Sequence, residues 1–185
     1  MALPRDYTTL TCALSRSLEI IGERWTLLIV RDAFYGVRRF GDFASHLNIP
    51  RAVLTDRLTA LVEADVLERT TPPGTRREVY GLTSKGLSLW PAVRALSAWG
   101  DEHYAPPAGP RRIFRHAQDD APLTPDGHCT HCKEPVPVRD ILITPGPGLS
   151  ANPTNPTTDE DPVSRALRTP HRLLTPLPPP KGQHP

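Results

Sequence analysis

Apolar residues recur every three to four positions in three successive stretches near the start of the chain, which predicts three helices. The stretches are residues 12–22, residues 24–36 and the shorter segment 40–47. The first two end at Gly22 and Gly36, and glycine commonly stops a helix. The apolar positions are Leu14, Leu18, Ile21, Trp25, Leu28, Ile29, Ala33, Phe40, Phe43, Ala44 and Leu47.

A fourth helix is predicted in the stretch NIPRAVLTDRLTALVEAD, residues 48–65. The stretch opens with turn-forming residues, so about three residues separate this helix from the one before it. One side is apolar, because Leu54, Leu58, Leu61 and Val62 recur at helical spacing. The first turns carry polar residues on the other side, namely Arg51, Thr55 and Arg57.

A hairpin and a last helix complete this part of the chain. The segments VLERTT and REVYGL, residues 66–71 and 77–82, have strand-like composition and flank the turn sequence PPGT. Thr83 is placed to cap a long helix over residues 84–104, which Pro91 should bend because proline lacks an N–H donor.

The resulting order is helix, helix, short helix, turn, helix, hairpin, helix. A short helix joined to a longer one by about three residues is the arrangement of the DNA-reading helix-turn-helix, and the hairpin then forms a wing. The sequence therefore predicts a mainly α winged helix-turn-helix domain with a small β-hairpin wing, over residues 1–104.

Proline content separates this domain from the rest of the chain. Five of the 23 prolines precede residue 103 and eighteen follow it. Proline at that density disrupts helix interiors and central strands. We therefore expect a largely irregular C-terminal extension over residues 105–148, and a disordered Pro-rich tail over residues 149–185.

Charge and cysteine content narrow the cellular setting. The formal net charge is +2, so an anionic partner would have to be met by local arginines and not by a strongly basic chain. The sequence shows neither a signal peptide nor an apolar stretch that could span a membrane, and three cysteines are too few for a secreted disulfide framework. These features favour a cytoplasmic protein without a membrane partner.

Six motifs, in order and at consistent separations, make the chain similar to the HxlR-type family of bacterial transcriptional regulators. The resemblance runs from Cys12 to about Gly100 and rests on Cys12, IGERWTLLIVRD, RRFGDF, VLTDRLTALVEADVLER, VYGLTSKG and LWPAV. It implies a winged helix-turn-helix that binds double-stranded DNA as a dimer. Pro50 and Ala52 depart from the family, where serine and a basic residue are common, so the family's base preference does not carry over.

Within such a fold, the start of the fourth helix would enter the major groove. Arginine there can bond a guanine edge through two donors, and threonine can contact a base or a phosphate. The wing and the start of the short helix would contact the phosphate backbone of the DNA. The DNA-binding candidates are Arg38, Arg39, Arg51, Ala52, Thr55, Asp56, Arg57, Arg76 and Arg77. The alternative to DNA binding is that these surface arginines only keep the protein soluble. In that case Arg57 pairs with Asp56 or Glu63 on its own helix.

The first and last helices carry more apolar surface than one small domain needs. Two half-sites are usually read by a two-fold symmetric pair, so this surface is assigned to a homodimer interface. Its members are Leu14, Leu18, Leu89, Val93, Leu96 and Trp99. The alternative is that some of them complete the core of the single subunit.

Cys12 is a candidate redox or electrophile sensor, because several relatives use a cysteine at this place in that way. Sensing requires a depressed thiol pKa and access, and Arg16 one turn later could stabilise a thiolate. The alternative is a small buried hydrophobe.

Cys129 and Cys132 have the two-residue gap that lets both sulfurs bind one zinc ion. Their stretch resembles a C-terminal extension found on some actinobacterial-type relatives, which implies a small ordered element and not a random tail. With no second cysteine pair, His116, His128 or His131 would have to supply the remaining ligands. A redox-active pair or two free thiols are the alternatives.

The sequence thus predicts a DNA-binding transcriptional regulator that needs no cofactor, apart from the zinc that the cysteine pair could hold. A winged helix used only for protein contacts would explain the fold but not the exposed arginines. An enzyme is disfavoured, because the sequence shows no nucleophile and base pair and no phosphate-binding glycine loop. The sequence does not identify an effector.

Overall fold

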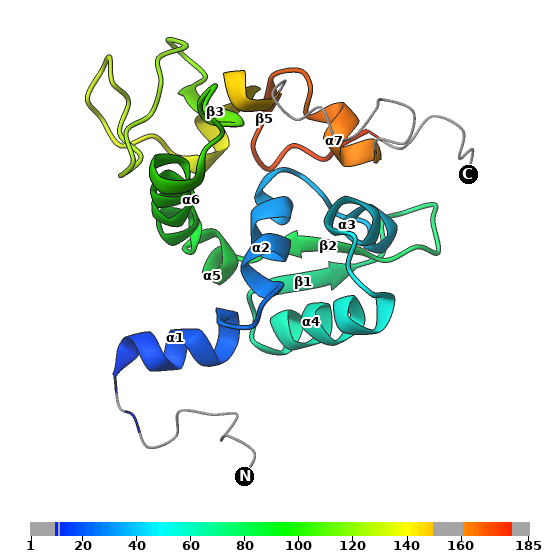
Figure 1. Ribbon diagram of the computed structural model, residues 1–185. Helices are drawn as coiled ribbons and strands as arrows, with labels where there is room; N and C mark the ends of the chain where they lie inside the picture. The colour runs from blue at the N-terminus through cyan, green and yellow to red at the C-terminus, as the bar shows by residue number, and fades with distance from the viewer. Residues whose placement is uncertain (1–9, 11, 150–160, 179–185) are drawn as a thin grey trace.

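The computed structural model describes residue 10 and residues 12–149 and 161–178, and it contains the predicted order of elements (Figure 1). The N-terminal part consists of α1 (Ala13–Ile21), α2 (Thr26–Phe34), α3 (Phe40–Leu47), α4 (Arg51–Glu63), β1 (Leu67–Thr70), β2 (Val79–Leu82), α5 (Ser84–Leu87) and α6 (Trp90–Tyr104). The winged helix-turn-helix fold predicted from the sequence is thereby confirmed. Within the described residues, no helix is long and apolar enough to cross a membrane.

The helix-turn-helix is formed by α3 and α4. Residues 48–50 connect them, and Asn48 adopts the left-handed conformation that reverses the chain after α3. Leu54, Leu58 and Leu61 point from α4 into the core and are at most 1% exposed. This apolar side fixes the orientation of α4, so its polar side faces outward.

The wing is a two-stranded antiparallel hairpin. Leu67 pairs with Leu82 and Thr70 pairs with Val79, and the loop between the strands projects from the body of the molecule (Figure 1). The wing is attached to the connection between α2 and α3, because the Tyr80 amide donates to the Arg38 carbonyl oxygen at 2.8 Å.

The predicted last helix is divided into two. Thr83 caps α5 as expected, since its hydroxyl oxygen accepts a hydrogen bond from the Gly86 amide at 3.0 Å. A turn at Ser88 and Leu89 follows, and α6 begins at Trp90. Pro91 therefore does not bend one long helix; it lies in the first turn of α6, where its missing N–H has no partner to lose.

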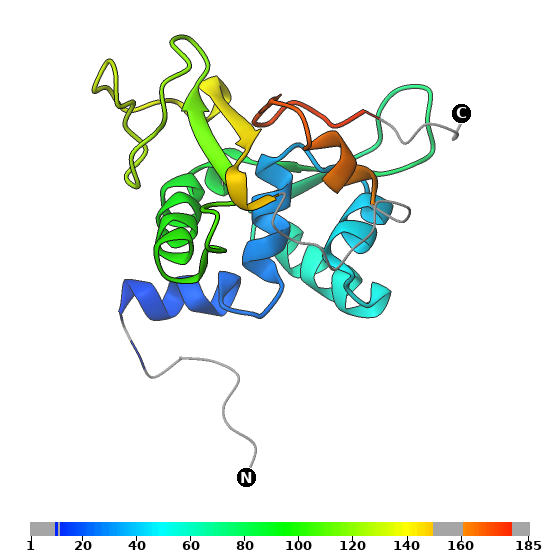
Figure 2. The same ribbon diagram turned by 45° about the horizontal axis from the view of Figure 1, so that its top comes forward.

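The C-terminal extension is largely irregular, but it also contains a three-stranded antiparallel sheet that the sequence did not predict. Its order is β3 (Arg112–His116), β4 (Ile141–Pro145) and β5 (His171–Arg172), and Figure 2 shows β3 and β4 side by side. Two short 3-10 helices flank β4, η1 (Val138–Asp140) and η2 (Pro147–Leu149). The sheet can accommodate prolines that lie at the ends of its strands, such as Pro145 at the end of β4.

Residues 161–178 depart from the predicted disorder of the tail. They contain α7 (Pro162–Ala166) and β5, and Val163, Leu167 and Leu173 are each 1% exposed. The prediction of disorder was based on the low overall hydrophobicity of the tail, which does not show that a few apolar residues are spaced so that they can be buried. Residues 150–160 and 179–185, also predicted to be disordered, lie outside the described residues.

The end of the described chain returns to α2. The Leu174 amide donates to the Phe34 carbonyl oxygen at 2.8 Å, and the Leu177 amide donates to the Gly36 carbonyl oxygen at 3.1 Å. Gly36 has a φ of +86°, and a Cβ there would lie 1.8 Å from the Thr175 carbonyl oxygen. Only glycine therefore permits this close approach.

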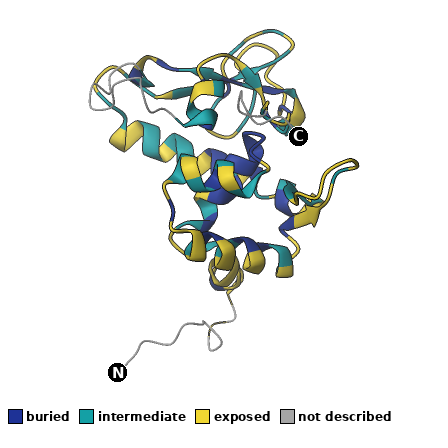
Figure 3. Cartoon of the chain, turned by 90° about the vertical axis from the view of Figure 1, so that its right-hand side faces the viewer, coloured by how far each residue is buried: buried dark blue, intermediate teal, exposed yellow. Residues whose placement is uncertain are grey.

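One hydrophobic core joins the winged helix to the extension. The rings of Phe34 and Trp90 lie edge to face with centroids 5.2 Å apart, and Trp90 packs in the same way on Phe114 of β3 at 5.5 Å. Buried residues, drawn dark blue in Figure 3, are concentrated at the centre of the molecule. The extension is thus packed on the N-terminal part and shares its core.

Candidate nucleic-acid interface

The first turns of α4 present a polar surface to solvent. Pro50 precedes the helix, and the Thr55 hydroxyl donates to the Arg51 carbonyl oxygen at 3.0 Å. Rotation of α4 would expose its buried leucines, so Arg51 and Thr55 stay on the solvent-exposed side of the helix. The four residues predicted to point away from the core are all exposed: Arg51, Ala52, Thr55 and Asp56.

Arg51 is oriented by an aromatic residue of the preceding helix. Its guanidinium lies over the ring of Phe40, 4.8 Å from the centroid. Phe40 is half-buried, so the contact guides the arginine and leaves its donors at the surface. The sequence pattern assigned Phe40 only to the core; its spacing before a turn gave no signal of this second role.

Arg38 and Arg39 lie at the start of α3, close to the wing. Arg38 is exposed and its carbonyl holds β2, whereas Arg39 Nη1 lies 3.7 Å from Asp42 Oδ2. Both side chains therefore lie between the helix-turn-helix and the wing, and Arg39 already has an acidic neighbour.

The wing loop holds Arg76 and Arg77 in exposed positions. The Arg77 amide donates to Thr75 Oγ1 at 3.0 Å, which tightens the turn. A hollow of about 890 Å³ separates the wing from the start of α3, and Arg39 and Arg77 both line it. The first turn of α4 and the wing loop lie on the same side of the molecule, at the right in Figure 1.

Arg57 differs from the other candidates. Its Nη1 atom lies 3.4 Å from Glu23 Oε2, in the connection between α1 and α2. The sequence had offered Asp56 or Glu63 as alternative partners, and the ion pair forms with neither of them. Glu23 lies far from Arg57 along the chain, so local spacing could not reveal it.

Exposed apolar side chains gather on α1 and α6, which both lie at the left in Figure 1. Leu14 and Leu18 are 65% and 38% exposed, and Leu96 and Trp99 are each 54% exposed. The exposed apolar residues that the predicted interface left out are Leu10, Ile20, Leu28 and Tyr104.

Two residues assigned to the predicted interface lie elsewhere. Val93 is 7% exposed and belongs to the core of the single subunit, and Leu89 is half-buried against that core. Both face inward because α6 packs on α2 through this side, which is the alternative that the sequence left open.

Cys12 is exposed and occupies the position immediately before α1. The backbone amides of Ser15 and Leu14 lower the pKa of its thiol, as expected at a helix N-terminus. The expected help from Arg16 is not seen, because both carboxylate oxygens of Glu19 lie 3.0 Å from Arg16 Nη1.

Cys129 and Cys132 lie in the extension together with His116 and Asp119, and one ligand atom from each lies within 4.8 Å of the others. These four residues could hold a metal ion. Of the histidines suggested by sequence, His116 joins the cluster, whereas His128 lies beside Asp126 at 3.1 Å. Asp119 was missed because nothing in its local sequence marks it as a ligand.

The outward polar start of α4, the wing and the buried helix-turn-helix core define a winged helix-turn-helix protein. Residues 20–107 match the family described as HxlR-like helix-turn-helix. Rv3095 of Mycobacterium tuberculosis and Mb3122 of Mycobacterium bovis are each 44% identical over 140 residues, which cover 75% of this chain and 89% of the relative. Both are named as uncharacterized HTH-type transcriptional regulators.

The fold likeness extends to a solved structure. The crystal structure of PA1607 matches with a TM-score of 0.61 at 30% identity, covering 70% of this chain and 91% of that one. The chain belongs to the HxlR-like helix-turn-helix family of transcriptional regulators.

Proposed function

We propose that this chain is a sequence-specific DNA-binding transcriptional regulator that acts as a cytoplasmic homodimer on a double-stranded operator. The observation that supports the proposal most strongly is that Arg51 and Thr55 are exposed at the start of α4, on the same side of the molecule as the wing loop. The relatives are named as regulators and not as enzymes, which supports a role without catalysis.

Base reading is assigned to the start of α4. Arg51 stands on a helix whose opposite side is buried, and Phe40 restricts its guanidinium. Preorganised in this way, the side chain can donate two hydrogen bonds to a guanine edge. Ala52, Thr55 and Asp56 share the surface and would contact neighbouring bases or the thymine methyl group.

Contacts with the DNA phosphate backbone are assigned to the arginines beside the wing and on its loop. Arg38 and Arg39 lie beside the wing, and Arg76 and Arg77 lie on its loop. They would position the duplex without reading its sequence. Arg57 would contribute a phosphate contact only by leaving Glu23, so we expect the smallest effect from it.

Dimerisation is assigned to the exposed apolar sides of α1 and α6. Leu14 and Leu18 on α1 and Leu96 and Trp99 on α6 leave large apolar side chains in water in the single subunit. Covering this surface with a second copy removes it from water and pairs two recognition helices for two half-sites.

A redox or electrophile response through Cys12 is a second proposal. It rests on the exposure of the thiol, on its lowered pKa and on its position at the start of α1, beside the proposed dimer surface. Modification there would change how the two subunits meet and thus the spacing of the recognition helices.

The decisive test is competition between operator and random duplex DNA. The operator would be selected from a random pool, and binding would be measured for the wild type, Arg51→Ala and, as a matched control, Arg139→Ala in the extension. Arg51→Ala should cost about 1–3 kcal/mol on the operator and relax the preference at one base pair. Arg139→Ala should leave both affinities unchanged. Equal losses on operator and random DNA would exclude base reading by Arg51, and no selection at all would favour a protein-contact module.

A further inference from the structure

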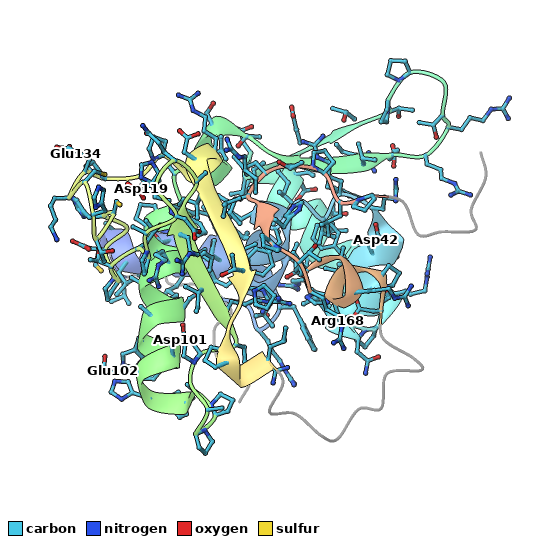
Figure 4. The ribbon with its side chains drawn as sticks, turned by 90° about the horizontal axis from the view of Figure 1, so that it is seen from above. Asp42, Asp101, Glu102, Asp119, Glu134 and Arg168 are labelled. Carbon is cyan, nitrogen blue, oxygen red and sulfur yellow. The ribbon has the colours of Figure 1, made fainter. Side chains whose placement is uncertain are left out.

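Four side chains with metal-binding atoms converge at the end of β3. Cys129 Sγ lies 3.3 Å and 3.4 Å from the two Asp119 carboxylate oxygens, and His116 Nδ1 lies 3.1 Å from Asp119 Oδ2. Cys132 Sγ lies 3.9 Å from the same His116 nitrogen. Figure 4 shows Asp119 far across the molecule from Asp42 of α3, so this cluster is separate from the helix-turn-helix.

These spacings match the edges of a zinc coordination shell. Zinc bonds of about 2.0–2.3 Å in a tetrahedron place the ligand atoms about 3.3–3.8 Å apart. The three neighbouring pairs, Cys129 with Asp119, Asp119 with His116 and His116 with Cys132, are separated by 3.1–3.9 Å, and all four ligand atoms lie within 4.8 Å of one another. The four side chains therefore need only a small adjustment to surround a single ion.

The backbone also arranges the cysteine pair for metal binding. The Lys133 amide donates to the Cys129 carbonyl oxygen at 3.0 Å, and Lys133 has a φ of +66°, so the chain turns sharply after Cys132. The His131 amide donates to Cys129 Sγ at 3.3 Å, a contact that favours thiolate sulfur. Cys129 is fully buried, so its sulfur would otherwise serve as a small apolar group.

We propose that His116, Asp119, Cys129 and Cys132 bind one structural zinc ion. Two thiolates, one imidazole and one carboxylate fill all four tetrahedral positions, so no position remains for a substrate. Soft thiolates with imidazole favour zinc over magnesium or calcium.

The ion would crosslink a long connection that contains neither a helix nor a strand. Residues 117–137 join β3 to η1, and their buried apolar side chains are Leu123, Cys129 and Val136. A zinc ion would tie Asp119 and the turn that contains Cys129 and Cys132 to the end of β3. The Leu123 carbonyl oxygen accepts a hydrogen bond from Arg94 Nη2 of α6 at 3.3 Å, so an ordered connection also supports the helix that carries Trp99.

Metal analysis of the full chain tests the proposal. The wild type, purified under reducing conditions, should contain about one zinc per chain. After the zinc is removed with a chelator, added cobalt should produce thiolate-to-metal charge-transfer absorption, which requires cysteine ligands. Cys129→Ser and His116→Ala should lose the bound zinc, and Asp119→Asn should weaken zinc binding at least about tenfold.

Matched controls separate ligands from neighbours. His128→Ala and His131→Ala change histidines of the same connection, and Cys12→Ser changes a distant thiol, so all three should keep one zinc per chain. Removing zinc from the wild type should lower the melting temperature, and the same treatment of Cys129→Ser should not. Wild-type protein that binds neither zinc nor cobalt, or that forms a Cys129–Cys132 disulfide with zinc present in excess, would overturn the proposal.

Discussion

Trp90 of α6 lies edge to face against Phe114 of β3, with ring centroids 5.5 Å apart, and the guanidinium of Arg94 covers the same Phe114 ring at 5.1 Å. Phe114 is 5% exposed. The winged helix therefore buries part of its core beneath a strand of the extension, and the two parts should lose stability together.

Phe114→Ala should destabilise the whole described fold. Removing a buried phenyl ring costs about 3–5 kcal/mol, because contacts are lost and a cavity remains. Denaturant unfolding followed by tryptophan fluorescence and by circular dichroism should shift in a single transition. Tyr104→Ala, which removes an exposed ring, is the matched control and should change stability by less than about 0.5 kcal/mol. An unshifted tryptophan transition in Phe114→Ala would show that the winged helix is independent of the extension.

Arg76→Ala should weaken binding to all DNA sequences alike. If Arg76 contacts one phosphate in each subunit, the slope of log affinity against log salt should become less steep by about 1.8 per dimer, at about 0.9 per contact. Titrations at several salt concentrations measure this slope. Arg69→Ala is the matched control, because Arg69 pairs with Glu78 at 3.5 Å at the base of the wing. An unchanged slope in Arg76→Ala would remove the wing loop from the interface.

Replacing Leu96 and Trp99 together by alanine should shift the protein toward monomer. Both side chains are 54% exposed in the single subunit, so the change should act on association more than on the subunit's core. Sedimentation velocity over a range of concentrations measures the dissociation constant. Glu63→Ala at the exposed end of α4 is the control. A double variant that remains as dimeric as the wild type would place the interface elsewhere.

Asp161 should stabilise the attachment of α7 in a pH-dependent way. Its Oδ1 atom accepts hydrogen bonds from the Val163 and Ser164 amides at 2.9 Å and 3.0 Å, and it lies 3.2 Å from His46 Nδ1 of α3. Burial alone raises the pKa of Asp161, but the hydrogen bonds from His46 and Ser164 outweigh burial and hold that pKa well below its usual range.

A depressed carboxyl pKa contributes stability above the unfolded-state value of about 3.9, and this contribution is lost as the pH falls toward the native value. At pH 7 the order of stability should be wild type, Asp161→Asn, Asp161→Ala, with about 0.5–2 kcal/mol lost from the missing helix cap in alanine. Denaturation measured as a function of pH should show the gap between wild type and Asp161→Asn shrinking below about pH 4. A gap that widened below about pH 4 would contradict the assigned charge.

Cys12→Ser should retain operator binding and lose any response to oxidants or quinones. The amides at the start of α1 lower the thiol pKa, so Cys12 should react with iodoacetamide at a pH where an ordinary thiol is mostly protonated. Cys132→Ser is the matched control, since it removes an exposed thiol of the extension and should preserve the response. Unchanged operator affinity after complete modification of Cys12 would exclude the sensor role.

Local patterns predicted the N-terminal elements because the relevant signals lie close together in the sequence. The leucine spacing of α4, the three residues before it and Thr83 as a cap each involve neighbours within a few positions. Contacts between distant residues had no such signal. Arg57 with Glu23, Trp90 with Phe114 and Asp119 with Cys129 all depend on packing that local periodicity does not encode.

The helices and strands after α6 were harder to predict because this part of the chain is rich in proline. Pro145 ends β4 and Pro162 begins α7, so both lie where a missing N–H is harmless. Composition alone cannot distinguish prolines at the ends of elements from prolines that prevent elements. The two cysteines suggested a metal site in the sequence, but only the fold revealed that the Asp119 carboxylate lies beside them.

The hydrogen bond from the Leu174 amide to the Phe34 carbonyl oxygen joins residues about 140 positions apart. During translation Phe34 is made about 140 residues before Leu174, so the end of α2 lacks this partner until residue 174 has been synthesised. Contacts of such long range slow folding, because a large loop must close before they form. A nascent chain, or one terminated before Leu174, would therefore leave the end of α2 without the segment that covers it.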